Sequence, residues 1–137
     1  MPDAAKPPRL FWAVALLALL WNGFGAYDFL MTNARDAAYV AAIPPAAMRQ
    51  IDAMPLWMIA AWALGAWGAV LGSMLLLLRS RHAVHAFAAS LAGLVVTTAY
   101  RARADMPVAD PLTAAVWIVA ALLLWFALRM RRRGVLR

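Results

Sequence analysis

Residues 55–78 read PLWMIAAWALGAWGAVLGSMLLLL, and no charged residue interrupts these 24 positions. A helix needs about 20 mainly apolar residues to cross the hydrocarbon of a bilayer. Three further apolar runs occupy residues 10–31, 83–100 and 112–128. We therefore predict an all-α integral membrane protein, with one four-helix bundle over residues 10–130. Residues 1–9 would form a short disordered cytoplasmic segment, and residues 131–137 a basic cytoplasmic tail.

The composition supports a membrane protein with little extramembrane mass. Hydrophobic residues make up 66% of the chain, compared with about 45–50% in soluble domains. The longest stretch between the runs, residues 32–54, is too short for a second catalytic domain. The first run has no A-x-A site closely following it, which favours an uncleaved span over the alternative, a cleaved signal peptide.

The distribution of charge predicts the orientation. The net charge is +7, but most basic residues flank the apolar runs, where they set topology rather than bind nucleic acid. Four basic and four acidic residues fall in the loops around residues 32–54 and 101–111, which gives no bias there. The opposite side holds one acid, Asp3, and nine basic residues: Lys6, Arg9, Arg79, Arg81, Arg129, Arg131, Arg132, Arg133 and Arg137. This excess predicts that both termini are cytoplasmic.

Polar residues and prolines between the apolar runs predict helix starts in the loops. Asn33 is a candidate cap for a short Ala-rich helix that ends before Pro44, and Pro45 suits the first position of a second short helix. These two pieces would lie on the membrane or cap the bundle, and a lid over a pocket is the alternative. Asp110 followed by Pro111 is a start signal for the last span.

Small residues are concentrated in the second and third spans. Gly68 and Gly72 form a G-x-x-x-G pair, Gly65 belongs to a second ridge of small residues, and Gly93 lies in the third span. Small residues let helices approach closely in a membrane. This pattern predicts packing of the second span within its own bundle, and homodimerisation through the same face is the alternative.

Asn22 is the most informative polar residue inside a span. At about 1.5 Å per residue from Leu10 it lies roughly 18 Å into the bilayer, past the middle of a hydrocarbon core of about 30 Å. Its amide needs a partner there, because no water is present. We predict an interhelical hydrogen bond, with ligand or transport contact as the alternative. The residues expected at a similar depth are Trp62 or Gly65, Thr97 and Trp117.

Asp28 is the one acidic residue inside an apolar run. Its depth places it near the headgroups, where it is predicted to be an interfacial anion paired with Arg35, Arg101 or Arg103; a functional carboxylate is the alternative. Helical spacing puts Trp21, Gly25 and Asp28 on one face. Gly25 is expected to bring another helix close to Asn22 and Asp28.

The sequence shows no group of residues that is typical of an active site or a metal site. His82 and His85 are spaced to share a helix face, and we predict interfacial histidines, with a metal or haem role as the alternative. The chain contains no Cys, so disulfides and thiolate metal sites are excluded. We find no nucleophile–base pair, phosphate-binding loop or carboxylate dyad, and we predict neither enzymatic activity nor a cofactor or metal site.

Several segments resemble a family of small bacterial four-span inner-membrane proteins that are often labelled "sugar transporter". The resemblance covers about residues 10–133 and rests mainly on LWNGFGAYD at residues 20–28, with MPLW at 54–57, GSMLLLLR at 72–79 and SL at 90–91. It implies a four-span fold in a bacterial inner membrane. Relatives often carry a Trp-like residue where this chain has His82.

The sequence favours a structural or accessory membrane protein. Its partners would be the lipid bilayer and either further copies of itself or a larger membrane complex. The alternative is a transporter or channel for a small, sugar-like solute that acts as an oligomer. The hydrogen bonds and flat apolar surfaces for that ligand would then come from Asn22, Tyr27, Trp62, Trp67, Thr97 and Trp117. A third reading is lipid recognition by the Arg-rich cytoplasmic rim.

Overall fold

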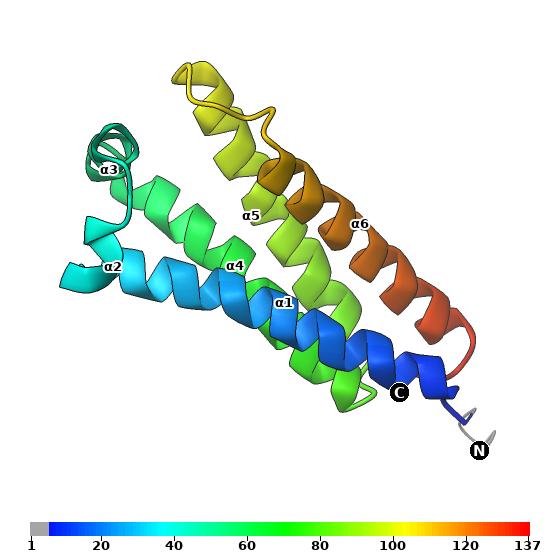
Figure 1. The fold of residues 1–137 in the computed structure, drawn as a ribbon. Coiled ribbons are helices and arrows are strands. Elements are labelled where there is room, and N and C mark those ends of the chain that lie inside the picture. Colours follow the sequence, from blue (N-terminus) through cyan, green and yellow to red (C-terminus); the bar gives the residue numbers. More distant parts are fainter. Residues whose placement is uncertain (1–5) are drawn as a thin grey trace.

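The computed structural model describes residues 6–137 and shows six helices in them (Figure 1). The four long ones are α1 (Arg9–Asn33), α4 (Leu56–Leu77), α5 (Ala83–Arg103) and α6 (Pro111–Arg132), and the short ones are α2 (Ala37–Ala41) and α3 (Pro45–Asp52). All four long helices are long and apolar enough to span a membrane. The predicted all-α, four-helix membrane fold is confirmed, and the chain is a multi-pass helical membrane protein.

The helices extend beyond the predicted apolar runs where polar residues follow. The run predicted to end at Tyr100 continues as helix to Arg103, and the run predicted to end at Leu128 continues to Arg132. Backbone hydrogen bonding carries a helix past the hydrocarbon into the polar interface, which hydropathy does not register. Of the predicted disordered segment 1–9, residues 1–5 lie outside the described part, and Arg9 already begins α1.

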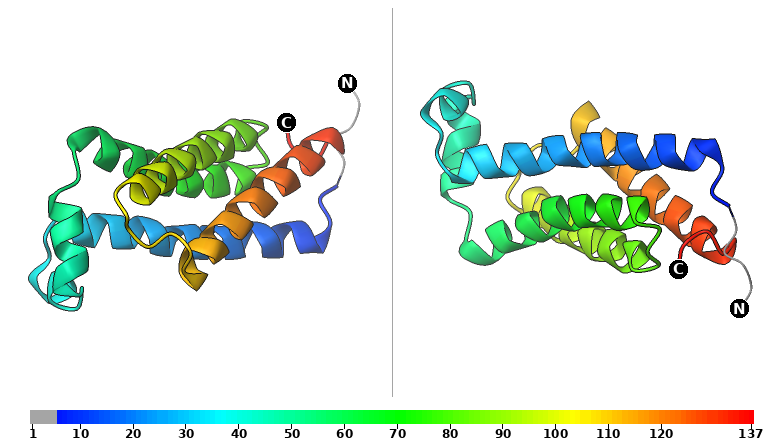
Figure 2. Two further views of the ribbon diagram at one scale, coloured as in Figure 1. Left: turned by 90° about the horizontal axis from the view of Figure 1, so that it is seen from above. Right: turned by 90° about the horizontal axis from the view of Figure 1, so that it is seen from below.

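The long helices converge at one end of the molecule and separate toward the other. The start of α1, the α4–α5 turn and the C-terminus lie together at what we term the terminal end (Figures 1 and 2). The segment from α2 to α3 and the α5–α6 connection lie at the opposite loop end (Figure 1). α4 and α5 form a hairpin, α1 packs on α4, and α6 packs on α5.

The principal buried core lies at the terminal end. Phe11, Leu76 and Ala127 come from three different helices, and each is fully buried. Phe11 stacks on Phe126 of α6, with ring centroids 6.0 Å apart. The residues of the core cluster lie in the first half of α1 and α5, in the last half of α4 and α6, and just after α6. Large side chains such as Phe24 and Ile118 are exposed on the outer surface, as a lipid-facing surface requires.

The residues after α6 are part of this core. Val135 and Leu136 are 3% and 5% exposed. The backbone pairs with the α4–α5 turn, because Arg81 N–H donates to the Arg137 carbonyl and Arg137 N–H donates to the Arg79 carbonyl, both at 2.7 Å. The segment predicted as a basic tail therefore begins as helix and then closes the terminal end of the bundle.

Two residues after the end of each long helix lies a residue with left-handed backbone conformation. Arg35 and Arg79 have φ of 57°, Asp105 has 52° and Gly134 has 71°. In each case the next N–H bonds back to a carbonyl in the last turn; Ser80 N–H, for example, donates to the Leu75 carbonyl at 2.8 Å. This is the Schellman arrangement, which favours glycine at the left-handed position. At three of the four ends a residue with a Cβ occupies it.

The sequence predicts the starts of α3 and α6 but not the cap of α2. Pro45 begins α3 and Asp110 caps α6, its carboxylate accepting from Thr113 N–H at 2.9 Å. The prediction for Asn33 is wrong, because this residue ends α1 and its amide donates to the Phe29 carbonyl within that helix. Asp36 caps α2 instead, accepting from the backbone N–H of Tyr39.

Candidate functional site

Asn22 joins α1 to α4 through hydrogen bonds. Its side-chain amide donates to Ser73 Oγ at 2.9 Å and lies 3.4 Å from the Ala69 carbonyl oxygen. Ser73 Oγ in turn donates to the Ala69 carbonyl at 2.9 Å, and Ser73 is fully buried. Such a satisfied network in hydrocarbon fixes the rotation of one helix against its neighbour.

The other residues expected at the depth of Asn22 do not join this network. Trp62 packs edge-to-face on Phe29, with ring centroids 5.0 Å apart. Thr97 donates to the Leu94 carbonyl in its own helix at 3.0 Å. Counting residues gave these side chains a depth similar to that of Asn22, but it does not give the direction of a side chain around its helix.

Trp117 makes a separate polar contact between α6 and α5. Its indole N–H donates to Thr98 Oγ1 at 3.1 Å. The aromatic and hydroxyl side chains that a sugar would need thus point to different neighbours. Among the described residues, every buried side-chain nitrogen or oxygen has a hydrogen-bond partner. The polar groups of the spans are arranged to hold helices together.

Four glycines set the close approach of α4 and α5. A Cβ at Gly93 would lie 2.6 Å from the Ala61 carbonyl oxygen and 2.7 Å from Gly65 N. A Cβ at Gly68 would lie 3.2 Å from that of Ser90, and one at Gly72 would lie 2.7 Å from the ring of Phe87. Ser90 Oγ donates to the Gly65 carbonyl at 2.6 Å across the same interface. The G-x-x-x-G face of α4 is therefore occupied by α5 of the same chain.

Gly25 is in a different environment. A Cβ built there meets no atom of the described chain within 4 Å outside its own helix backbone. Trp21, one turn earlier, is 40% exposed. No helix of the described chain fills the space beside Gly25, so within residues 6–137 Gly25 does not bring another helix close to Asn22 and Asp28.

Asp28 pairs with a tyrosine instead of an arginine. Tyr39 of α2 donates its hydroxyl to Asp28 Oδ1 at 2.6 Å, and its ring packs edge-to-face on Tyr27 at 5.8 Å. The hydrogen bond to Asp28, followed by burial and the charge of Asp28, raises the pKa of Tyr39 to about 12. The contact holds α2 against the end of α1, and nothing in the run of residues 10–31 signalled Tyr39 as the partner.

Two of the three arginines proposed as partners for Asp28 have other contacts, and Arg103 forms no ion pair with residues 6–137. Arg35 forms an ion pair with Asp52 at 2.5 Å, which connects the end of α1 to the end of α3. Arg101 lies 3.7 Å from Asp110 and also contacts Thr113 and the Pro107 carbonyl. The predicted pairing of Asp28 with Arg35, Arg101 or Arg103 is therefore wrong.

His82 and His85 lie together at the start of α5, with ring centroids 5.7 Å apart. Within residues 6–137, no third His, Cys, Asp or Glu joins them in a group that could hold a metal. Two imidazoles provide fewer ligands than the three or four of a zinc site. The pair adds polar surface to the terminal end, beside the basic residues of the α4–α5 turn.

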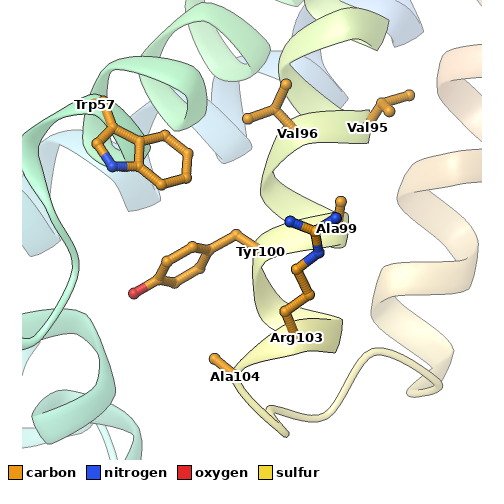
Figure 3. Close-up of a pocket in the computed structure, with 7 residues that line it drawn as sticks. All are labelled: Trp57, Val95, Val96, Ala99, Tyr100, Arg103 and Ala104. Atoms are coloured by element: carbon orange, nitrogen blue, oxygen red, sulfur yellow. The ribbon is translucent and has the colours of Figure 1, made fainter.

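An open recess lies at the loop end, where α4 and α5 separate (Figure 3). It has a volume of about 510 Å³ and is lined by Trp57, Val95, Val96, Ala99, Tyr100, Arg103 and Ala104. The rings of Trp57 and Tyr100 form one wall, edge-to-face with centroids 5.5 Å apart. Residue spacing does not predict this recess, because its lining comes from two helices that hydropathy treats alike.

Comparisons with known proteins add no family assignment. No family model, no curated protein and no solved structure matches this chain. The resemblance to small four-span bacterial proteins therefore stays a prediction. The description that the fold and the contacts support is a multi-pass helical membrane protein whose intramembrane polar groups connect its own helices.

Proposed function

We propose that this chain is a structural or accessory protein of a bacterial inner membrane, and that it associates with another membrane-embedded helix through one face of α1. This α1 face comprises Trp21, Gly25 and Asp28, which recur at helical spacing. The proposed partner is a helix of a second copy or of a larger membrane complex. Its backbone would approach α1 at Gly25, beside the exposed ring of Trp21.

The open space around Gly25 is the observation that supports this proposal. Glycine in a helix interior is about 0.5–1 kcal/mol less favourable than alanine. Gly68, Gly72 and Gly93 offset that cost by admitting a neighbouring helix, as the short distances from their built Cβ positions show. Gly25 has no such neighbour in the described chain. A helix from another protein would give this glycine the same role.

The location and orientation belong to the same proposal. The start of α1 and the C-terminus lie at one end of the molecule, together with Arg81 and the Arg-rich last turn of α6 (Figure 1). A basic end of this kind is retained on the cytoplasmic side during insertion. We therefore place both termini in the cytoplasm and the loop end on the opposite side.

Mass measurement after mild detergent extraction tests the association. The wild-type chain is expected in a complex heavier than its own 14.9 kDa plus detergent. Gly25→Leu should release the monomer, because a leucine side chain occupies the space that the partner backbone needs. Ala114→Leu is the matched control: it adds the same side chain at an exposed position of α6 and should leave the complex intact.

Solute uptake provides the contrary test. Purified chain in proteoliposomes is expected to show no uptake of small sugars above that of empty vesicles. Uptake that disappears in Asn22→Ala or Asp28→Asn, with a wild-type chain that is monomeric in mild detergent, would contradict the accessory role. It would assign the chain to the small-solute transporters instead.

A further inference from the structure

The recess at the loop end combines an apolar floor with one cationic group at its mouth. Val95 and Val96 are 49% and 41% exposed, so this part of α5 faces the hydrocarbon without cover from another helix of the chain. Figure 3 shows the rings of Trp57 and Tyr100 on one side, Val96 above them, and the guanidinium of Arg103 lying over Ala99. The recess is therefore reached from the lipid as well as from the surface.

Arg103 differs from Arg101, the other arginine in the last turn of α5. Arg101 is paired with Asp110. Arg103 takes part in no ion pair or side-chain hydrogen bond with residues 6–137, and the nearby Asp105 is not within ion-pair distance of it. Its side chain extends along α5 over Ala99, toward the membrane (Figure 3). An unpaired guanidinium at this position is complementary to an anion at headgroup depth.

We propose that this recess is a binding site for an anionic phospholipid. The lipid phosphate would accept hydrogen bonds from Arg103, for which a guanidinium is well shaped. The glycerol region would lie beside Tyr100, and the upper part of one acyl chain would follow the exposed surface of Val96 and Val95.

The dimensions agree with this ligand. Arg103 lies eight residues after Val95, which corresponds to about 12 Å along the helix and matches a phosphate, a glycerol and the first part of an acyl chain. The volume of about 510 Å³ lies in the range of roughly 300–1,000 Å³ that is usual for small-molecule sites. Trp57 and Tyr100 are the aromatic types that favour the interface between headgroup and hydrocarbon.

Native mass spectrometry in a neutral detergent tests the site. The probes are phosphatidylglycerol, phosphatidylcholine with the same acyl chains, and inorganic phosphate. The wild-type chain is expected to retain one phosphatidylglycerol molecule in preference to phosphatidylcholine. Arg103→Gln should reduce this preference about tenfold, the usual scale for loss of one charge-assisted contact. Ala99→Trp should fill the recess and lower the binding of both lipids.

Arg132→Gln is the matched control. It removes the same charge from an exposed residue at the terminal end and should leave the lipid preference unchanged within about twofold. Circular dichroism establishes that each variant is folded. Equal retention of both lipids by the wild type, an equal loss in Arg132→Gln, or saturation by inorganic phosphate alone would each overturn the proposal. The test does not involve the α1 face, so its failure is distinguishable from failure of the proposed association.

Discussion

Replacement of Gly93 by alanine should separate α4 from α5. The added Cβ would lie 2.6 Å from the Ala61 carbonyl oxygen and 2.7 Å from Gly65 N. Both atoms are backbone atoms, so no side-chain rotation relieves the contact. Ordinary van der Waals contact begins near 3.4 Å, which requires the helices to move apart by about 0.8 Å.

That displacement weakens a hydrogen bond between the two helices. The hydrogen bond from Ser90 Oγ to the Gly65 carbonyl would lengthen from 2.6 Å to about 3.4 Å, where such a bond contributes little. Overpacking of this kind typically costs about 1–3 kcal/mol. We expect Gly93→Ala to lower the free energy of unfolding by that amount. The better helix propensity of alanine offsets up to about 1 kcal/mol of this loss.

Gly25→Ala is the matched control for Gly93→Ala. It makes the same chemical change in a helix interior, at a position where the Cβ meets no neighbour in the described chain. In monomeric, detergent-solubilised protein it should raise stability by about 0.5–1 kcal/mol. The assay is reversible unfolding in mixed micelles, followed by tryptophan fluorescence and circular dichroism. A Gly93→Ala chain as stable as wild type, or a Gly25→Ala chain that is the less stable of the two, would refute the packing argument.

Four further outcomes follow from particular contacts. Asn22→Leu should lower stability by about 0.6–2 kcal/mol, and a double-mutant cycle with Ser73→Ala should show coupling; additive losses would exclude their hydrogen bond. Asp105→Gly should raise stability by about 1 kcal/mol in the same unfolding assay, because it relieves a φ of 52°. Leu136→Ala should cost about 2 kcal/mol, and an unchanged midpoint would place that side chain outside the core. Ultraviolet titration should show that Tyr39 has a pKa near 12, compared with an ordinary value of 10.0. The hydrogen bond from Tyr39 to Asp28 should contribute fully to stability below about pH 10, and this contribution should disappear as the pH rises through 12. Asp28→Asn should return the pKa of Tyr39 toward its ordinary value.

The sequence predicts the elements well because each span is long, apolar and bounded by charge or proline. It predicts the contacts less well for a physical reason. α1 is apolar around its whole circumference, so hydrophobic periodicity does not reveal which side faces α4. Counting residues from the start of the span indicates that Asn22 is a mid-span polar group that needs a partner. The same count puts Trp62 or Gly65 of α4 at that depth, whereas the hydrogen-bond partner in α4 is Ser73.

The glycines show the same limit. Gly25 and Gly93 are equivalent in any reading of composition or spacing, yet one is open on its outer side and the other touches the backbone of α4. The neighbours of a residue depend on helix rotation and crossing, which only the assembled bundle defines. Tyr39 was missed for a related reason: it lies in a loop helix whose position depends on the ends of α1 and α4.

Because the core cluster lies at the terminal end, the lipids of the two leaflets contact differently packed parts of the bundle. In one leaflet, lipids surround a closed four-helix section that Phe11 and Phe126 hold together. In the other, α1 and α6 diverge (Figure 1), and acyl tails border a more open arrangement of the same helices. We therefore expect the lateral pressure in that second leaflet, and with it the shape of the surrounding lipids, to affect the angle between α1 and α6.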